Sequence, residues 1–203
     1  MPKGSRTIAV FDFDNTLIRG DSLWPFLTAL AGWPRSCFAM VETIATFIRR
    51  YMKDKNDPEL KDPRTFIKAR LLKHLLTGYW VGNLTPIFEK LQRWQKWNEP
   101  VRQALLDHQA QGHHIVIASG SLDLYLPWLL QDLPHQAVIC TRMEIKEGFI
   151  SGKMVTENCV RAGKAEMVAD YIAEQGPFED SWGYGNFPHD LPMLNLLKQR
   201  ILV

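Results

Sequence analysis

The feature that most constrains the fold is a short apolar segment that runs into two carboxylates. Residues 8–11 are IAVF, and Asp12 and Asp14 follow at once. An apolar run of this kind is typical of a strand buried on both faces, as in a parallel sheet. Side chains two residues apart in a strand point to the same side, so the two carboxylates would crowd each other unless the chain turns and a cation lies between them. Open parallel sheets bind ligands at the carboxyl ends of their strands, so this pair is a candidate site.

The same pair has a purely structural interpretation. Asn15 and Thr16 are turn-forming residues, and an aspartate in this setting can close an Asx-turn or cap a helix. Taken alone, the D-x-D pattern does not separate a catalytic pair from a turn. The distinction depends on the rest of the chain.

From residue 101 onward the chain alternates between predicted strands and predicted helices. Strands are expected over 113–118, 137–141, 181–185 and 201–203, helices over 101–111, 122–130, 162–175 and 191–198, and a hairpin over 143–154. Together with a first strand over 7–13, this predicts an α/β fold, a Rossmann-like parallel sheet with helices on both faces. The last expected strand coincides with the end of the chain, so whether the sequence is complete at its C-terminus does not follow from it.

Residues 20–100 show helical patterns and are expected to form an all-helical insertion after the first strand. Two helices divided at Pro34 are predicted over 23–51, and further helices over 65–76 and 84–97. The expected domains are a Rossmann-like core of residues 1–19 and 101–203 and a helical cap of residues 20–100.

The net charge of +2 over 203 residues is too small to indicate a nucleic-acid partner, and none is expected. The charge is unevenly placed. Residues 23–100 carry 13 Lys and Arg against 7 Asp and Glu, whereas the remainder carries 11 against 15. A basic cap on an acidic core suits an anionic substrate, and a solvated helical face would give the same imbalance.

One part of the cap has two interpretations. Residues 36–48 are apolar apart from a few polar positions such as Glu42, and this stretch is too short to span a bilayer. It is followed by four basic residues, Arg49, Arg50, Lys53 and Lys55. Such a helix can make a peripheral contact with an anionic membrane surface. The favoured alternative is a cap helix packed against its neighbours.

The cysteines bear on the compartment. Cys37, Cys140 and Cys159 are odd in number, lie far apart and form no C-x-x-C pair. This favours reduced thiols over disulfides or a zinc site and predicts a cytoplasmic protein. Residues 1–6 have no apolar core, so no signal peptide is expected. The oligomeric state does not follow from the sequence.

Four segments, in this order, resemble the motifs of the haloacid-dehalogenase superfamily. They are D-x-D-x-T-L at 12–17, HIVIASG at 114–120, Lys164 near a predicted helix start, and GYGNFPHDLPML at 183–194. The position of the cap resembles the phosphoserine-phosphatase-like branch (subfamily IB), and its length and apolar layout also resemble the phosphatidylglycerophosphatase C type. The resemblance implies a Mg²⁺-dependent phosphatase for a small phosphorylated metabolite or a lipid phosphate.

The resemblance also implies roles for individual residues. Asp12 would be the nucleophile that becomes an aspartyl phosphate, and Asp14 would protonate the leaving alcohol and later activate water. Haloacid dehalogenases lack this second acid and P-type ATPases have Thr there, so Asp14 favours phosphate-ester hydrolysis. Ser119 and the backbone N–H of Gly120 would bind phosphoryl oxygens, and Lys164 would neutralise the phosphate charge.

The second motif and its neighbours leave an alternative open. Residues 119–121, SGS, are expected to form a loop after the strand, and they also invite a serine-hydrolase interpretation. The segment is not the G-x-S-x-G elbow of that class, and no triad order is evident. The phosphatase interpretation is therefore preferred.

The fourth motif departs from the family pattern, because Asn186 replaces the usual metal-binding aspartate. The implied Mg²⁺ ligands are an Asp12 oxygen, the Asp14 backbone carbonyl and Asn186, while Asp190 would hold Lys164 or a metal-bound water. An amide brings no charge. Weaker Mg²⁺ binding, a changed metal preference, and a weakly active or non-catalytic phosphate-binding relative are the resulting alternatives.

Substrate contacts are expected from the connector and the cap. Asp21 lies nine residues after Asp12, where phosphoserine phosphatases carry a substrate-binding Glu. Arg70, with Lys68 and Arg50, is a candidate cap cation for the substrate.

Overall fold

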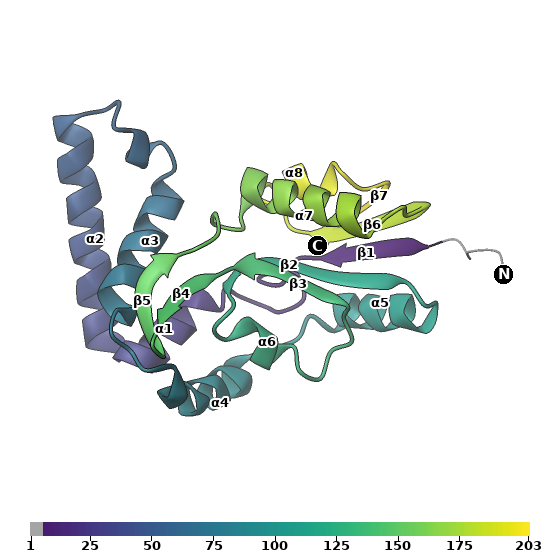
Figure 1. Ribbon diagram of the computed structural model, residues 1–203, viewed down its shortest axis with the longest axis horizontal. Helices are drawn as coiled ribbons and strands as arrows, with labels where there is room; N and C mark the ends of the chain where they lie inside the picture. Colours follow the sequence, from purple (N-terminus) through teal and green to yellow (C-terminus); the bar gives the residue numbers. More distant parts are fainter. Residues whose placement is uncertain (1–5) are drawn as a thin grey trace. The chain divides into compact units, whose positions relative to one another are not determined.

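The computed structural model describes residues 6–203, which form two compact units (Figure 1). The sheet unit contains the described residues up to Ser22 together with Trp94–Thr141 and Thr156–Val203. The helical unit contains Leu23–Arg93 and Arg142–Val155. The expected division into residues 1–19 with 101–203 and residues 20–100 stays a prediction about domains. The compact units differ from it mainly in residues 142–155.

The sheet unit is built on five parallel strands. They are β1 (Thr7–Phe11), β2 (His114–Leu122), β3 (Ala137–Thr141), β6 (Asp180–Gly185) and β7 (Gln199–Leu202). Their order is β3-β2-β1-β6-β7, and every neighbouring pair is parallel. The first strand in sequence is therefore the central strand of the sheet, and Ile8 to Phe11 are fully buried on it.

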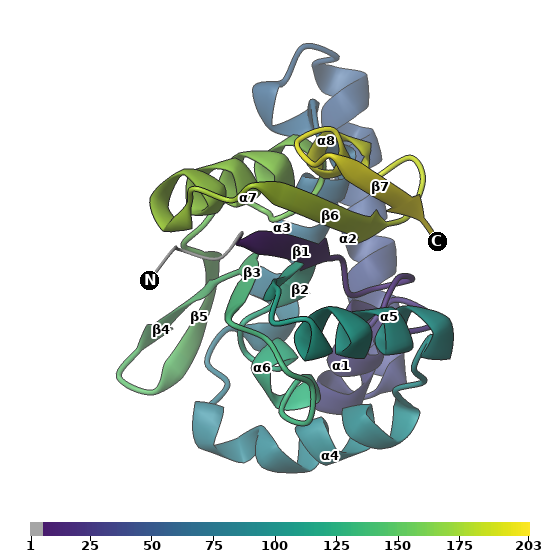
Figure 2. The ribbon, with the colours of Figure 1, turned by 90° about the vertical axis from the view of Figure 1, so that its right-hand side faces the viewer.

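Helices cover both faces of this sheet (Figure 2). They are α5 (Glu99–Ala110) and the short α6 (Leu126–Leu129) on one face, and α7 (Arg161–Gln175) and the short α8 (Leu191–Leu194) on the other. Ile8 and Val10 belong to a buried cluster with residues of α7 and α8, whereas the Phe11 ring meets His108 of α5 edge to face. This alternation along β1 is what a strand buried on both faces requires. The predicted α/β fold class is confirmed.

The helical unit is formed mainly by the inserted segment. Its elements are α1 (Leu23–Ala31), α2 (Trp33–Lys53), η1 (Pro58–Leu60), α3 (Pro63–Leu76), η2 (Val81–Asn83), all but the last residue of α4 (Thr85–Trp94), β4 (Met143–Lys146) and β5 (Phe149–Met154). Asp62 caps α3 by accepting hydrogen bonds from the N–H groups of Arg64 and Thr65. Pro34 lies in the first turn of α2, where its missing N–H is not needed. The break between α1 and α2 falls at Gly32, which has a φ of 80°.

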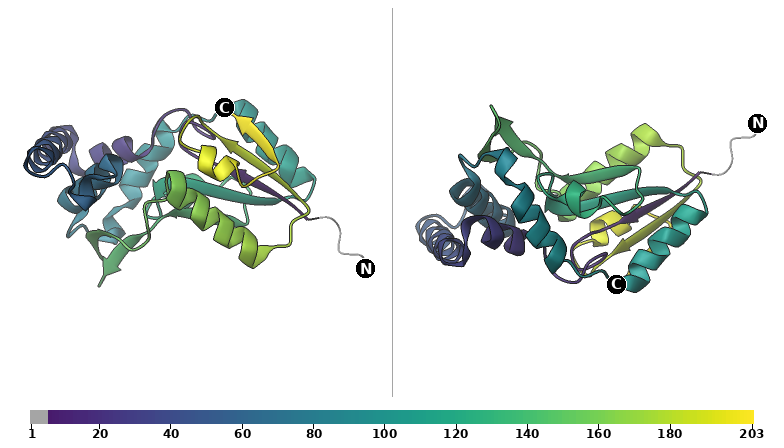
Figure 3. Two further views of the ribbon diagram at one scale, coloured as in Figure 1. Left: turned by 90° about the horizontal axis from the view of Figure 1, so that it is seen from above. Right: turned by 90° about the horizontal axis from the view of Figure 1, so that it is seen from below.

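The antiparallel β4–β5 hairpin belongs to the helical unit, although the sequence analysis placed it in the core (Figures 1 and 3). The Gly78 N–H donates to the Ile150 carbonyl and the Val81 N–H donates to the Gly148 carbonyl. The rings of Trp80 and Phe149 lie 5.0 Å apart. These backbone hydrogen bonds join the hairpin to the segment that follows α3. The helical unit therefore contains a β-hairpin in addition to its helices.

Two further findings concern the described part of the chain as a whole. No disulfide joins the three cysteines of this part of the chain, Cys37, Cys140 and Cys159. Within residues 6–203, no helix combines the length and the apolar character needed to cross a membrane.

Candidate active site

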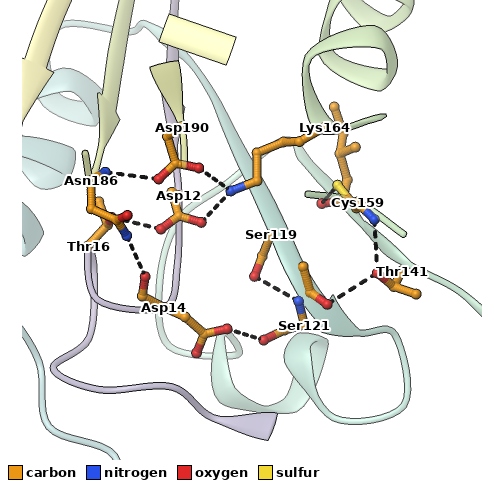
Figure 4. Close-up of polar contacts among 12 residues, drawn as sticks. Asp12, Asp14, Thr16, Ser119, Ser121, Thr141, Cys159, Lys164, Asn186 and Asp190 are labelled. Atoms are coloured by element: carbon orange, nitrogen blue, oxygen red, sulfur yellow. Dashed lines mark hydrogen bonds and ion pairs between the residues drawn. The ribbon is translucent and has the colours of Figure 1, made fainter. Parts of the chain in front are cut away.

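Side chains from the four predicted segments lie together at the carboxyl edge of the sheet (Figure 4). Asp12 follows the last residue of β1, and its N–H donates to the Tyr184 carbonyl of β6 at 2.9 Å. This bond continues the sheet pattern by one residue and holds the aspartate at the strand end. Every hydrogen bond described for the site below joins residues of the sheet unit.

A buried ion cluster forms the centre of the site. The Lys164 ammonium of α7 donates to Asp12 Oδ1 and to Asp190 Oδ1, both at 2.6 Å, and all three side chains are at most 5% exposed. Burial alone would lower the pKa of Lys164, but the two carboxylates outweigh it and hold this pKa well above its ordinary value. Two carboxylates against one ammonium leave the cluster one negative charge in excess. A further cation, or a proton, would balance it.

Both oxygens of the Asp12 carboxylate are fixed. Lys164 contacts one oxygen, and the Thr16 hydroxyl donates to the other at 2.7 Å. Burial raises the pKa of the Asp12 carboxyl, and the nearby Lys164 ammonium opposes this rise. The result is a carboxylate with a set orientation at a strand end.

Asp190 is held as firmly as Asp12. Its second carboxylate oxygen accepts the Asn186 N–H at 2.9 Å, and the residue is 2% exposed. A Cβ on Gly185 would lie 2.6 Å from the Asp190 Cβ, so only glycine allows this close approach. Asp190 therefore orients Lys164 together with Asp12.

Asp14 lies in a different hydrogen-bond network. Its carboxylate accepts the Ser22 N–H at 2.8 Å and the Ser121 hydroxyl at 2.5 Å. The Tyr125 hydroxyl lies 3.0 Å from the hydroxyls of both serines. Burial, and then the negative charge of Asp21, raise the pKa of Asp14 to about 7, although the two hydrogen bonds oppose this. The group can thus hold or release a proton near neutrality.

This raised pKa predicts a pH-dependent stability penalty in the metal-free protein. The folded Asp14 keeps its proton up to a pKa of about 7, whereas the ordinary value is 3.8, so stability falls as the pH rises between these values. Asp14→Asn removes the ionisation, and we expect it to raise the free energy of unfolding by about 2 kcal/mol at pH 8 and much less at pH 4. Urea unfolding in EDTA at both pH values measures the difference. An equal gain at both pH values, or a gain in the surface variant Asp132→Asn, would contradict the prediction.

Ser119 and Gly120 belong to β2, which continues to Leu122. The loop expected at 119–121 is wrong, because the pairing with β3 shifts register after Ser119 and the Thr141 hydroxyl donates to the Gly120 carbonyl at 3.1 Å. The fully buried Ser119 hydroxyl accepts the Ser121 N–H at 3.0 Å. No hydrogen bond found among residues 6–203 uses the hydrogen of this hydroxyl, which can therefore be donated to an anionic partner. The helix expected over 122–130 is correspondingly reduced to α6.

The proposed metal ligands can be tested against this geometry. The Asn186 side-chain NH₂ donates to the Asp14 backbone carbonyl at 3.2 Å, so two of the three expected ligands contact each other. Adjacent oxygens in octahedral Mg²⁺ coordination lie about 3 Å apart, because each Mg–O bond is about 2.1 Å. Turning the amide over would bring its oxygen to this position, beside the Asp12 carboxylate. The three groups therefore fit Mg²⁺, provided that the amide turns over.

This ligand set contains little charge of its own. Within residues 6–203 no three His, Cys, Asp or Glu side chains are grouped so that they could hold a metal ion by themselves. A Mg²⁺ site here would depend on one backbone carbonyl and one amide in addition to Asp12. Substrate phosphate and water would have to supply the remaining ligands.

The predicted substrate contacts are divided between the two units. Asp21 is exposed and lies in the sheet unit, near enough to raise the pKa of Asp14. Arg70 lies on α3 of the helical unit and pairs with Glu42 at 2.6 Å. Arg50 pairs with Asp57 and Glu59. Lys68, also on α3, is buried. The substrate-binding roles of Asp21 and Arg70 stay predictions.

The sequence analysis missed the residues that hold the two acids. Thr16 contacts Asp12, while Ser22, Ser121 and Tyr125 surround Asp14. Thr16 stands within the D-x-D-x-T-L motif, so its position was a usable signal. Nothing in the local sequence indicates that Ser22 shares one network with Ser121 and Tyr125, which lie about 100 residues further along the chain.

Comparison with known proteins gives consistent matches. The profile of the haloacid dehalogenase-like hydrolase family matches residues 9–195. A histidinol-phosphatase of Neisseria meningitidis serogroup C (strain 8013) is 22% identical over 214 residues, which cover 98% of this chain and 90% of that protein. A solved structure from Bordetella pertussis Tohama I, of unknown function, aligns with a TM-score of 0.75 and 21% identity over 98% of this chain and 90% of that one. A phosphoserine phosphatase solved as a phospho-aspartyl intermediate analogue aligns with a TM-score of 0.65 and 17% identity, over 98% and 86% of the two chains.

Fold and site together define a parallel α/β protein whose candidate active site lies at the carboxyl edge of the central strand. The profile match extends over most of the chain, and this protein belongs to the haloacid dehalogenase-like hydrolase family. The superfamily that the four motifs predict is thus confirmed. The solved structures are similar in fold, whereas the resemblance to the phosphatidylglycerophosphatase C type stays a prediction.

Proposed function

We propose that this protein is a Mg²⁺-dependent phosphomonoesterase in which Asp12 is transiently phosphorylated. The observation that carries the proposal is that two neighbouring acids of the motif have different partners. Asp12 is bound to an ammonium group, whereas Asp14 has a pKa of about 7. A nucleophile must be ionised and its acid–base partner must exchange a proton near the working pH. The histidinol-phosphatase and phosphoserine phosphatase relatives add support.

The first half of the reaction transfers the phosphoryl group to the protein. An Asp12 carboxylate oxygen forms a bond to phosphorus while the bond between phosphorus and the alcohol oxygen breaks. Asp14 donates its proton to the departing oxygen, so the alcohol leaves neutral. The Thr16 and Lys164 contacts keep the attacking carboxylate in a fixed orientation.

The second half returns the protein to its starting state. Asp14, now ionised, takes a proton from a water molecule as the water oxygen attacks phosphorus. The bond between phosphorus and Asp12 breaks, and inorganic phosphate leaves. The same residue thus serves as acid and then as base, which suits a pKa near neutrality.

Three groups of the site act on the phosphoryl charge. Lys164 stays protonated over the working pH range, because two carboxylates hold its pKa high, and its ammonium group offsets negative charge. The Ser119 hydroxyl and the Gly120 N–H are the proposed donors to phosphoryl oxygens. Mg²⁺, when bound by Asp12, the Asp14 carbonyl and Asn186, supplies further charge neutralisation.

The proposed substrates are small phosphomonoesters. Phosphoserine and histidinol phosphate are candidates because of the relatives described above. A lipid phosphate such as phosphatidylglycerophosphate is a candidate because the cap resembles that of the phosphatidylglycerophosphatase C type. We propose that the cap, residues 20–100, selects among them, with Asp21 and Arg70 as substrate contacts. Asp21 would favour a substrate that carries an amine.

A phosphate-release assay with this panel tests the proposal. With Mg²⁺ we expect turnover of p-nitrophenyl phosphate and of at least one panel member, loss of activity in EDTA, and recovery when Mg²⁺ is restored in excess. Acid-quenched protein after a brief reaction with radiolabelled substrate should carry label on Asp12. Undiminished activity in EDTA would contradict the mechanism. Turnover with no radiolabel on the protein, in samples quenched at several reaction times, would also contradict it.

The Asn186–Asp14 hydrogen bond favours a second candidate, a phosphate-binding relative without turnover. Under this alternative the Asn186 amide would keep its hydrogen bond to the Asp14 carbonyl, and no Mg²⁺ would bind there. Phosphate would bind through Lys164 and Ser119. Calorimetry separates the two candidates. The relative without turnover binds inorganic phosphate equally with and without Mg²⁺, whereas the enzyme binds it more tightly with Mg²⁺.

A further inference from the structure

Helix α2 exposes a continuous row of large apolar side chains. Of the 15 large hydrophobic residues exposed among residues 6–203, seven lie on this helix: Trp33, Phe38, Val41, Ile44, Ile48, Tyr51 and Met52. We call these seven the α2 stripe. Val41 is 66% exposed and Met52 is 77% exposed. Such a concentration on one element marks an interaction surface, since exposed apolar residues are otherwise scattered singly.

The stripe occupies one side of the helix. At about 100° per residue, the seven side chains fall within an arc of about 140°. The opposite side packs within the helical unit. There Ser36, Ala39 and Thr43 are buried. A helix with one face bound to its own protein presents only the other face to a partner, along a length of about 30 Å.

Basic residues border the stripe. Three exposed basic residues lie next to the stripe on one side: Arg35, Arg49 and Lys53. If Trp33 is set at 0°, the stripe covers about 0–140° around the helix axis and these three residues lie at about 160–200°. None of the ion pairs found among residues 6–203 involves these three cations. Glu42, the single acid of α2, lies in the same sector at about 180°, and its charge is neutralised by Arg70 of α3 at 2.6 Å. The surface is therefore apolar with a positive edge.

We propose that α2 docks this protein on an anionic lipid bilayer, lying in the plane of the membrane surface. Aromatic and aliphatic side chains enter the boundary between headgroups and acyl chains, while Arg35, Arg49 and Lys53 contact acidic headgroups. The basic edge selects this partner over a second copy of the chain. A copy would bring its own basic row to the interface, whereas an anionic surface complements it. The proposal is independent of the catalytic mechanism.

Sedimentation of the full chain with large vesicles tests the proposal. We expect binding to vesicles of 70% phosphatidylcholine and 30% phosphatidylserine at low salt, at least about tenfold weaker binding to pure phosphatidylcholine, and release at high salt. Phe38→Ser with Val41→Ser should weaken binding at least about tenfold. Arg49→Gln with Lys53→Gln should weaken it by about tenfold at low salt and by much less at high salt.

Matched variants make the outcome decisive. Ile145→Ser with Val155→Ser removes two exposed apolar side chains of the same unit outside α2 and should leave binding unchanged. Circular-dichroism melts check that each variant is folded. If the variant Phe38→Ser with Val41→Ser does not fold, the variant Arg49→Gln with Lys53→Gln still tests the surface. Absence of binding at low salt, equal loss in the control pair, or dimers that α2 variants disrupt without any vesicle binding would each overturn the proposal.

Discussion

Asp12→Asn is expected to lower kcat for phosphate release by about four orders of magnitude or more. The amide is isosteric with the carboxylate but is a poor nucleophile toward phosphorus, and removal of a catalytic nucleophile commonly has effects of this size. The substitution also leaves Lys164 with one carboxylate partner in place of two. Stopped or continuous assays of p-nitrophenyl phosphate hydrolysis at saturating Mg²⁺ measure the loss.

Two controls separate lost chemistry from lost folding. Asp132→Asn makes the same chemical change on an exposed residue of the sheet unit and should retain full activity. The unfolding midpoint of Asp12→Asn shows whether the variant is folded under assay conditions. A folded Asp12→Asn protein with activity within tenfold of the wild type would remove Asp12 from the role of nucleophile.

Asn186→Asp is expected to tighten Mg²⁺ binding by at least about tenfold. In the wild type the Asn186 NH₂ donates to the Asp14 carbonyl, so Mg²⁺ must first displace that hydrogen bond. A carboxylate at position 186 has no hydrogen to donate and adds a negative charge beside Asp12, so it favours a cation in this place. Calorimetric titration with Mg²⁺ alone, without substrate, gives the change in affinity.

The same substitution should have the opposite effect when no metal is present. The introduced carboxylate would place an oxygen against the Asp14 carbonyl and near the excess negative charge of the Lys164 cluster, at a cost of about 1–3 kcal/mol. We therefore expect a lower unfolding midpoint in EDTA and a larger gain on adding Mg²⁺ than in the wild type. Asn186→Ala, which supplies neither a hydrogen bond nor a charge, is the matched control and should not tighten Mg²⁺ binding. If Asn186→Asp and Asn186→Ala change Mg²⁺ affinity alike, position 186 is not a metal ligand.

The sequence predicted the sheet well because each strand has a local signature. Residues 8–11 are apolar without alternation, which is how a central parallel strand differs from a strand with one wet face. The strand–helix alternation after residue 100 then allows few arrangements of a parallel sheet. The end of β2 was mispredicted because SGS is typical of a turn. Hydrogen bonds from β3, including that of Thr141 to Gly120, keep these residues in the sheet.

The hairpin shows a second kind of limit. Its turn at Glu147 and Gly148 is a local signal, and both residues have positive φ values, 50° and 82°. Its partner is not local, because Ile150 bonds with Gly78 and Tyr79, about 70 residues earlier. Local patterns therefore placed the element but not the unit to which it belongs.

The sequence by itself determined the succession of strands and helices along the chain and the location of the two acids at a strand end. It also determined that Asn186 replaces the usual acid of the fourth motif. These properties depend on neighbouring residues or on single positions. Only the tertiary structure decided that Lys164 joins Asp12 to Asp190, that Ser22, Ser121 and Tyr125 surround Asp14, and that the Asn186 amide contacts the Asp14 carbonyl. The states of these groups arise from burial and from charges that the fold brings within hydrogen-bond distance, and such proximity is not encoded at any one position of the chain.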